Sequence, residues 1–204
     1  MTGICVIVGA GSIQEEEIWV NPGDYVIGAD GGLEYLAHRG IHPDMALGDF
    51  DSLGYVPDHE NVVRHPVMKD DTDMMLAVRE GLKQGCSMFR IYGGLGGRLD
   101  HTLGNIQTLM YLAELGKRGE LIGGGVHVTA INNGKITFDC SPKGYISVFC
   151  LSGKSEGIWI RGLKYPLEDA VMTSGQVLGV SNEFLGVDSE IGVKNGSLVI
   201  VWYD

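Results

Sequence analysis

The chain has 204 residues, of which 44% are hydrophobic and 20% are charged, a composition typical of a globular protein. Its formal net charge of −11 argues against non-specific nucleic-acid binding. No apolar run approaches the roughly 20 residues that a membrane-spanning helix needs, and no basic segment precedes Ile4–Val8, so we expect neither a membrane anchor nor a secretory signal. The cysteines lack C-x-x-C spacing, so we interpret them as buried thiols in a reducing cytoplasm, not a disulfide framework or zinc site.

The first 120 residues alternate short apolar runs with segments of helical periodicity. We expect strands at Ile4–Val8, Tyr25–Ala29, Met45–Leu47, Val62–His65 and Met88–Tyr92. Helical patterns cover residues 33–38, 72–85 and about 100–116. Alternation of this kind predicts an α/β fold with a mostly parallel sheet flanked by helices.

Beyond the triple glycine Gly123–Gly125 the pattern changes to short strands without a long helix. Val126–Ile131 and Lys135–Asp139, joined by Asn133-Gly134, predict a β-hairpin. Further strands are expected at Tyr145–Leu151, Gly157–Arg161, Glu190–Lys194 and Ser197–Tyr203. We therefore predict an α/β domain over residues 1–123 and a smaller all-β sandwich domain over residues 124–204.

Two carboxylates follow the apolar run Met45–Leu47. Asp49 and Asp51 are two positions apart, so their side chains point to one side if the chain continues extended. Two like charges held close together resist joint ionisation unless a cation intervenes, and oxygen ligands favour Mg²⁺ or Mn²⁺ over zinc. An isolated D-x-D is nevertheless more often a solvated turn.

Further acids fall where the predicted strands end. Asp30 follows one strand, Asp73 lies at the start of the helix after another, and Asp100 follows the glycine-rich segment after a third. The carboxyl ends of parallel strands meet at one edge of the sheet, where open α/β sheets bind ligands. This shared placement favours a metal and phosphate site, although Thr72 and Asp73 could simply cap their helix.

The segment Gly93–Gly97 lies between a predicted strand and a predicted helix and is followed by Arg98. Backbone without side chains can approach a polyphosphate, and the helix N-terminus and Arg98 add positive potential. Arg98 could instead pair with Asp100, and His101 could cap or pack. The earlier segment Gly9–Gly11 lacks the third glycine of a dinucleotide motif and is equally consistent with a tight turn.

Six motifs, in order along the chain, resemble those of the thiamine pyrophosphokinase family. They are GADGG at 28–32, GDFDS at 48–52, DDTD at 70–73, GGLGGRLDHTLGN at 93–105, GLKYPL at 162–167 and GVSNE at 179–183. The resemblance implies an enzyme that transfers the diphosphate group of ATP to the hydroxyl of thiamine, giving thiamine diphosphate and AMP. It also implies a Mg²⁺-dependent α/β catalytic domain, a thiamine-binding β-sandwich, and a homodimer with the thiamine site at the subunit interface.

The resemblance also assigns roles to individual residues. Asp49, Asp51 and Asp73 match the family's Mg²⁺ ligands, and Arg98 and Asp100 match the pair beside the transferred group. The expected ATP-contacting positions are Asp30, Gly31, Asp71, Thr72, Gly96, Arg98 and Asn105, and the expected thiamine-contacting positions are Asp100, Tyr165, Ser181 and Asn182.

The chemistry of these residues agrees with the assignment. Arg98 would stabilise the transferred group, and Asp73 would act through the metal. Asp100 would orient or deprotonate the attacking hydroxyl, or hold the substrate cation or the metal. The acid run is shorter than the D-Q-D-x-T-D form of some members, which leaves the role of Asp71 open.

Three other functions remain open. The chain could be a diphosphokinase for another alcohol such as a hydroxymethylpterin, a non-catalytic nucleotide- or thiamine-binding regulator, or a metal-dependent phosphohydrolase that uses water. The two motifs in the second half of the chain argue against the first alternative, and the intact set of acids argues against the second.

Overall fold

The computed structural model describes residues 3–14, 18–50, 59–64 and 71–204. Its chain divides into a first unit, residues 1–108 and 119–124, and a second unit, residues 109–118 and 125–204. The helices are α1 (Gly32–His38), α2 (Asp73–Lys83) and α3 (Leu99–Glu114). The division passes through α3, whose last residues group with the second unit. Among the described residues, no helix is long and apolar enough to cross a membrane.

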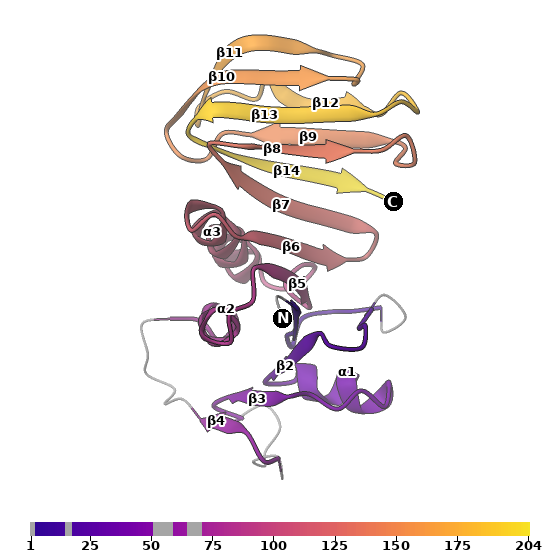
Figure 1. The fold of residues 1–204 in the computed structure, drawn as a ribbon, viewed down its shortest axis with the longest axis vertical. Coiled ribbons are helices and arrows are strands. Elements are labelled where there is room, and N and C mark those ends of the chain that lie inside the picture. Colours follow the sequence, from indigo (N-terminus) through magenta and orange to yellow (C-terminus); the bar gives the residue numbers. More distant parts are fainter. Residues whose placement is uncertain (1–2, 15–17, 51–58, 65–70) are drawn as a thin grey trace. The chain divides into compact units, whose positions relative to one another are not determined.

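The first unit contains strands in the order β6-β5-β1-β2-β3-β4 (Figure 1). Their bounds are β1 Ile4–Val8, β2 Tyr25–Ala29, β3 Met45–Gly48, β4 Val62–Arg64, β5 Met88–Tyr92 and β6 Arg118–Gly123. From β5 to β4 all neighbouring strands are parallel, which confirms the predicted parallel sheet. The sequence pattern did not predict β6, since polar and glycine residues interrupt its apolar positions.

Helices cover both faces of this parallel sheet. On one face Leu36 of α1 shares a buried cluster with Val6 and Val8 of β1. On the other face α2 approaches β1 so closely that a Cβ at Gly81 would lie 2.7 Å from the Cys5 Sγ. Side chains of β1 alternate between the two helices, so the strand is apolar throughout.

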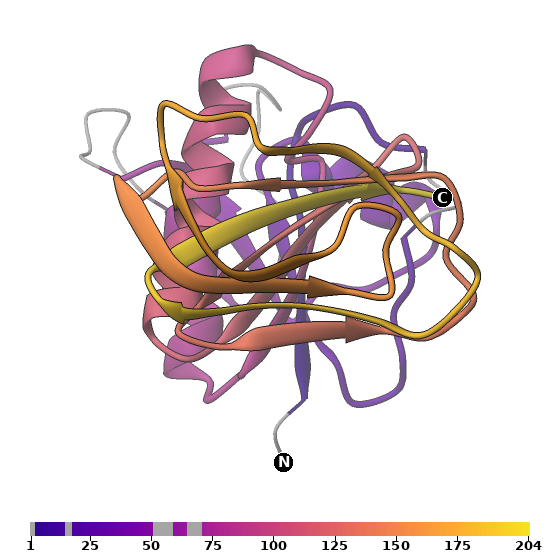
Figure 2. The same cartoon turned by 90° about the horizontal axis from the view of Figure 1, so that it is seen from above.

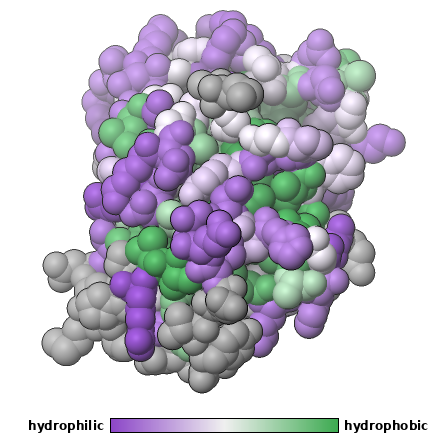
Figure 3. Space-filling view, turned by 60° about the horizontal axis from the view of Figure 1, so that its bottom comes forward, coloured by the Kyte–Doolittle hydropathy of each residue, from purple (hydrophilic) through white to green (hydrophobic). Residues whose placement is uncertain are grey.

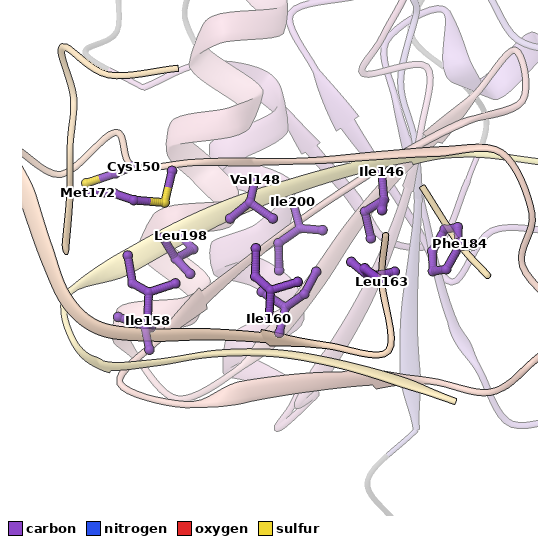
Figure 4. Packing of buried hydrophobic residues seen from close by; sticks show 12 residues of the cluster. Ile146, Val148, Cys150, Ile158, Ile160, Leu163, Met172, Phe184, Leu198 and Ile200 are labelled. Carbon is purple, nitrogen blue, oxygen red and sulfur yellow. The ribbon is translucent and has the colours of Figure 1, made fainter. Parts of the chain in front are cut away.

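The second unit is a sandwich of two antiparallel sheets, whose strands run across the view of Figure 2. The sheet orders are β12-β9-β14-β7 and β11-β10-β13-β8. The bounds are β7 Val126–Asn132, β8 Lys135–Phe138, β9 Tyr145–Phe149, β10 Lys154–Arg161, β11 Leu167–Thr173, β12 Gly179–Glu183, β13 Ser189–Asn195 and β14 Ser197–Tyr203. Figure 4 shows Val148 and Ile200 of one sheet meeting Ile158 and Ile160 of the other in the core.

The turn at Asn133-Gly134 does not close the predicted hairpin. It carries the chain between sheets, because β7 pairs with β14 whereas β8 pairs with β13. The turn at Asn195-Gly196 crosses in the same way, and the two turns are joined: Asn133 N donates to Gly196 O over 3.0 Å and Gly196 N donates to Asn133 Oδ1 over 2.8 Å. Each crossing lets the apolar faces of both its strands meet in one core, so the hairpin prediction was wrong.

Two further features of the second unit were not expected from the sequence. Strands β11 and β12 lie at sheet edges, and β11 is mostly exposed, so its sequence lacks the alternation that marks a strand. Cys140 is exposed, whereas Cys5, Cys86 and Cys150 are buried. Trp159 alternates with the core residues on β10, and its Nε1 donates to Glu190 Oε1 over 2.6 Å.

The surface agrees with the acidic, moderately hydrophobic composition. On the face drawn in Figure 3, hydrophilic residues cover most of the surface and hydrophobic residues lie between them. Scattered apolar side chains are normal on a protein surface. Hydropathy on this face therefore does not mark a binding site, and the arrangement of particular residues has to be considered.

Candidate active site

A cavity of about 470 Å³ lies at the carboxyl ends of the parallel strands in the first unit. This volume falls in the range of small-molecule sites, roughly 300–1,000 Å³. The lining segments are Gly9–Ser12 after β1, Ala29–Asp30 at the end of β2, Thr72–Met74 at the start of α2, and Gly93–Arg98 with His101, Thr102 and Asn105. Of the acids expected at this edge of the sheet, Asp30 and Asp73 line the cavity, whereas Asp49 and Asp100 are not among the described lining residues.

The two glycine-containing loops of the cavity lie against each other. Gly9 N donates to Tyr92 O over 2.9 Å, and Gly11 N donates to Gly93 O over 3.1 Å. A Cβ at Gly11 would lie only 2.3 Å from Gly93 O, so a side chain there would separate the loops. The segment after β1, which the sequence pattern made equally consistent with a nucleotide-binding loop and a tight turn, thus forms one wall of the cavity.

Asp30 follows β2 in a left-handed backbone conformation, with φ 48°. Its backbone N donates to Leu47 O over 2.9 Å, and its Oδ1 accepts a hydrogen bond of 3.4 Å from the backbone N of Phe50. A Cβ at Gly48 would lie 1.8 Å from Oδ1, so only glycine fits there. Phe50 also has a positive φ of 59°, and such conformations cost about 1 kcal/mol or more outside glycine. The neighbouring strand ends hold this strained arrangement.

Asp30 and Asp73 line the cavity, and Asp49 lies close enough for its charge to act on Asp30. Burial, followed by the charges of Asp73 and Asp49, raises the pKa of Asp30 to about 6, although the hydrogen bond from Phe50 N acts in the opposite direction. Asp30 and Asp73 also share a side-chain hydrogen bond. Such a bond between two carboxyl groups needs a proton, and a bound cation could take the place of that proton.

The chemistry of these donors fits a hard divalent cation, because all are carboxylate oxygens. Asp49 and Asp73 are two of the three predicted Mg²⁺ ligands, and the third, Asp51, lies outside the described residues. Within the described part of the chain, no group of three or more His, Cys, Asp or Glu residues is arranged to hold a metal ion. The complete Mg²⁺ site is therefore still a prediction.

The start of α2 positions Asp73. Thr72 is the N-cap, and its Oγ1 accepts a hydrogen bond of 3.2 Å from Met75 N, as the sequence predicted. Two other expected ATP-contacting residues are not among those lining the cavity: Asp71 forms an ion pair with Arg79, and Gly31 is the N-cap of α1. Asp71 Oδ2 lies 3.1 Å from Arg79 Nε.

Arg98 and Asp100 form an exposed ion pair. Arg98 Nη2 lies 2.6 Å from Asp100 Oδ2, and Nε donates to Oδ1 over 3.2 Å. The hydrogen bond from Arg98 lowers the pKa of Asp100. Arg98 lines the cavity and Asp100 does not, so the structure shows the alternative in which these two residues pair with each other. Because the pair is exposed, solvent screens it, and exchange of one partner for a substrate group costs little.

The expected ATP-contacting residues Gly96 and Asn105 both line the cavity. Asn105, however, is only 7% exposed, and its Nδ2 donates to Gly94 O over 2.8 Å. The side chain therefore fastens the glycine-rich loop to α3, a contact that no sequence motif indicates.

The predicted thiamine-contacting residues of the second unit lie together. Asn182 Oδ1 accepts from Tyr165 N over 2.9 Å, and Nδ2 donates to Tyr165 O over 2.7 Å. Oδ1 also accepts from Glu183 N over 2.9 Å. The ring of Tyr165 is exposed, and Lys164 Nζ lies 5.6 Å from its centroid. Asn182 thus holds the backbone of Tyr165 in place.

Ser181 lies at an irregularity in β12, where the pairing with β9 shifts register between Gly179 and Asn182. Its φ of 59° is left-handed, and its N donates to Ser147 Oγ over 3.1 Å. The side chain is exposed. The strained backbone beside Tyr165 parallels that of Asp30 in the first unit.

Comparison with known proteins identifies the family. The description "Thiamin pyrophosphokinase, catalytic domain" matches residues 16–118, and "Thiamin pyrophosphokinase, vitamin B1 binding domain" matches residues 134–200. A thiamine pyrophosphokinase of Bacillus subtilis is 30% identical over 198 residues, covering 94% of this chain and 89% of that protein.

Solved structures agree with these matches. The crystal structure of thiamine pyrophosphokinase from Bacillus subtilis is similar with a TM-score of 0.87 at 29% identity, covering 98% of both chains. That of thiamin pyrophosphokinase from Geobacillus thermodenitrificans has a TM-score of 0.84 at 27% identity, covering 98% of this chain and 97% of the other. The chain therefore belongs to the thiamin pyrophosphokinase family, whose motifs its sequence resembles in both units.

Proposed function

We propose that the cavity of the first unit binds ATP with Mg²⁺, and that the chain thereby performs the reaction of its family. In that reaction the diphosphate group of ATP passes to the hydroxyl of thiamine, giving thiamine diphosphate and AMP. The supporting observation is that Asp30 and Asp73 line a cavity together with two glycine-containing loops, and that the charge of Asp49 acts on Asp30. Diphosphoryl transfer depends on neutralising and aligning phosphate charge more than on covalent help.

We take residues 1–123 as the catalytic domain. Its residues would have separate roles in the reaction. Asp49 and Asp73, together with Asp51, would hold Mg²⁺, which when bound neutralises charge on the phosphates. Arg98 lies at the cavity and would exchange its partner Asp100 for the transferred group. Asp100, once released, would orient or deprotonate the hydroxyl of thiamine.

Residues 124–204 would bind thiamine. The thiazolium ring is a fixed cation, and the exposed face of Tyr165 suits such a charge. Ser181 and the backbone that Asn182 organises would contact the rest of the thiamine molecule.

We also propose a cytoplasmic homodimer with this site at the subunit interface. Support comes from the exposed apolar side chains of the same unit, which are Val177, Leu178, Val180, Leu185 and Val187.

One assay tests the proposal. The protein is incubated with ATP, Mg²⁺ and either thiamine or a hydroxymethylpterin, and AMP, ADP and phosphate are quantified. We expect AMP and thiamine diphosphate in equal amounts, with thiamine alone as acceptor. Release of ADP or phosphate, AMP release without thiamine, or transfer to the pterin would contradict the proposal.

A further inference from the structure

Three successive carbonyl groups, where β5 leads into the glycine-rich loop, accept hydrogen bonds from other parts of the protein. Each accepts one hydrogen bond: Tyr92 O from Gly9 N at 2.9 Å, Gly93 O from Gly11 N at 3.1 Å, and Gly94 O from Asn105 Nδ2 at 2.8 Å. A carbonyl oxygen turned toward the cavity would repel an anion. These three bonds therefore suit a loop that receives negative charge.

The N–H groups of the same loop have no such partners. Within the described ranges, none of the backbone N–H groups of residues 94–97 donates a hydrogen bond, and all four residues line the cavity. Gly93 and Gly96 are left-handed, with φ of 71° and 74°. Alternation between right- and left-handed backbone can turn successive N–H groups toward one concave side, where an anion binds.

Asn105 supplies the third of these bonds from a side chain, whereas the other two come from the backbone of the opposite loop. Its position leaves little room for movement. A Cβ at Gly94 would lie 2.7 Å from Leu121 Cδ2 and 3.2 Å from Asn105 Nδ2. Gly94 is thus enclosed by β6 and by the Asn105 amide, and its carbonyl orientation depends on that amide.

We propose that Asn105 is a positioning residue, which holds the Gly94 carbonyl back so that the loop offers N–H groups to the polyphosphate of ATP. This inference rests on the proposed function in that the anion is taken to be the ATP polyphosphate. The residue acts through the loop, so its removal weakens binding of phosphate groups and leaves binding of the nucleoside nearly unchanged. A purely structural role would weaken both together.

Three variants test the assignment. Asn105→Leu keeps the size and the neutral charge but cannot donate to Gly94 O. Asn105→Gln keeps an amide donor on a longer chain. Thr108→Val is the matched control: Thr108 lies one turn further along α3, is 1% exposed, and its Oγ1 donates to Gly104 O over 3.0 Å. It does not line the cavity, so this variant loses a partly buried hydrogen bond without affecting the loop.

The affinities of each variant for ATP, inorganic tripolyphosphate and adenosine are measured by titration calorimetry in the presence of Mg²⁺. For Asn105→Leu we expect about tenfold weaker binding of ATP and tripolyphosphate, which is the loss of one well-placed interaction, and adenosine binding within about twofold of the wild type. Asn105→Gln recovers part of the loss. Thr108→Val lowers the melting temperature and leaves the ratio of the three affinities unchanged.

Wild-type affinity for tripolyphosphate in folded Asn105→Leu, or an equal loss for adenosine and ATP, overturns the inference. If Asn105→Leu does not fold, Asn105→Ser replaces it under the same criteria, since the serine hydroxyl is too short to reach Gly94 O. Thiamine-dependent AMP release by the wild type is assayed separately. Its absence would refute the proposed function, whereas the tripolyphosphate result judges the role of Asn105 by itself.

Discussion

The acids of the two units have different neighbours. In the first unit, burial and the charges of Asp73 and Asp49 raise the pKa of Asp30 to about 6. In the second unit, exposed or half-buried acids lie against cations, in the pairs Lys164–Glu183, Arg161–Glu168, Lys135–Glu190 and Lys194–Asp169. Both units contain ion pairs at the surface, but among the described residues only the first unit also places like charges around a cavity-lining acid, Asp30. The grouping of the acids, more than their number, therefore marks the candidate catalytic site.

The largest effect should follow from removing one carboxylate of the cluster. Asp73→Asn keeps the shape of the side chain and removes a proposed Mg²⁺ ligand, so we expect kcat/KM for thiamine-dependent AMP release to fall by about a thousandfold. Thermal unfolding of the metal-free protein should not be impaired, because Asp73 raises the pKa of Asp30 through like-charge repulsion. The kinetic assay and calorimetry together measure both quantities.

Asp169→Asn is the matched control for this variant. Asp169 is exposed and pairs with Lys194 over 2.7 Å in the second unit, so its replacement should leave kcat/KM within about twofold of the wild type. Activity of Asp73→Asn within tenfold of the wild type would remove the argument that the cluster holds the metal.

The second largest effect is expected in the second unit, where Asn182 positions the backbone of Tyr165. Asn182→Leu leaves the backbone N and O of Tyr165 and the N of Glu183 without their present partners. We expect a loss of about 2–4 kcal/mol in unfolding free energy, and a KM for thiamine raised about tenfold with the KM for ATP unchanged. Steady-state kinetics with each substrate varied, and denaturant unfolding, measure these changes. An unchanged KM for thiamine would show that the position of Tyr165 does not affect substrate binding.

Much of the fold could be predicted from the sequence, because burial leaves a periodic signal. The strand β1 and the helix α2 appear where apolar spacing places them. Strand β11 left no such signal because it is mostly exposed. The turn at Asn133-Gly134 was misassigned because a short Asn-Gly segment can join two strands of one sheet or carry the chain from one sheet to the other. Only the pairing with the second turn, at Gly196, distinguishes them.

The candidate site was predictable in part for similar reasons. The motifs and the strand ends indicated Asp30, Asp49 and Asp73 correctly as neighbours. They did not reveal that Asn105 and Asn182 bond to the backbone of distant loops, since such contacts depend on the three-dimensional approach of Gly94 and Tyr165. The motifs identify residues of the site, and the structure shows that Asn105 and Asn182 hold the backbone of other residues in place.

A smaller effect concerns pH. Asp30 has a usual pKa of 3.8, which burial and then Asp73 raise to about 6 in the folded protein. Because the pKa of Asp30 is higher in the folded protein than in the unfolded chain, ionisation of this carboxyl lowers the free energy of unfolding. This cost is absent below about pH 4 and grows as pH rises through 6. The shift corresponds to about 3 kcal/mol, which solvent screening at this partly buried group reduces to about 1 kcal/mol.

Asp30→Asn should therefore stabilise the metal-free protein at pH 8 by about 1 kcal/mol and have no stabilising effect at pH 4. Melting temperatures across this range, with and without Mg²⁺, provide the measurement. Mg²⁺ should stabilise the wild type more than the variant, since the ion relieves the same repulsion. A stabilisation by Asp30→Asn that is equal at both pH values would contradict the assigned cause.

The smallest effect tests the balanced charges of the second unit. Lys164 pairs with Glu183 over 2.7 Å and also lies 5.6 Å from the centre of the Tyr165 ring, where the thiazolium cation of thiamine is proposed to bind. The pair is exposed, so Lys164→Met should change the melting temperature by no more than about 1 °C. It removes a competing cation and leaves Glu183 negative, so thiamine affinity should rise about two- to threefold at low salt and return toward that of the wild type at high salt.

Lys194→Met removes a cation of the same kind, paired with Asp169, and should not change thiamine affinity. Weaker thiamine binding by Lys164→Met would instead make this lysine part of the thiamine site, and the charge balance of the second unit would then serve binding as well as the fold.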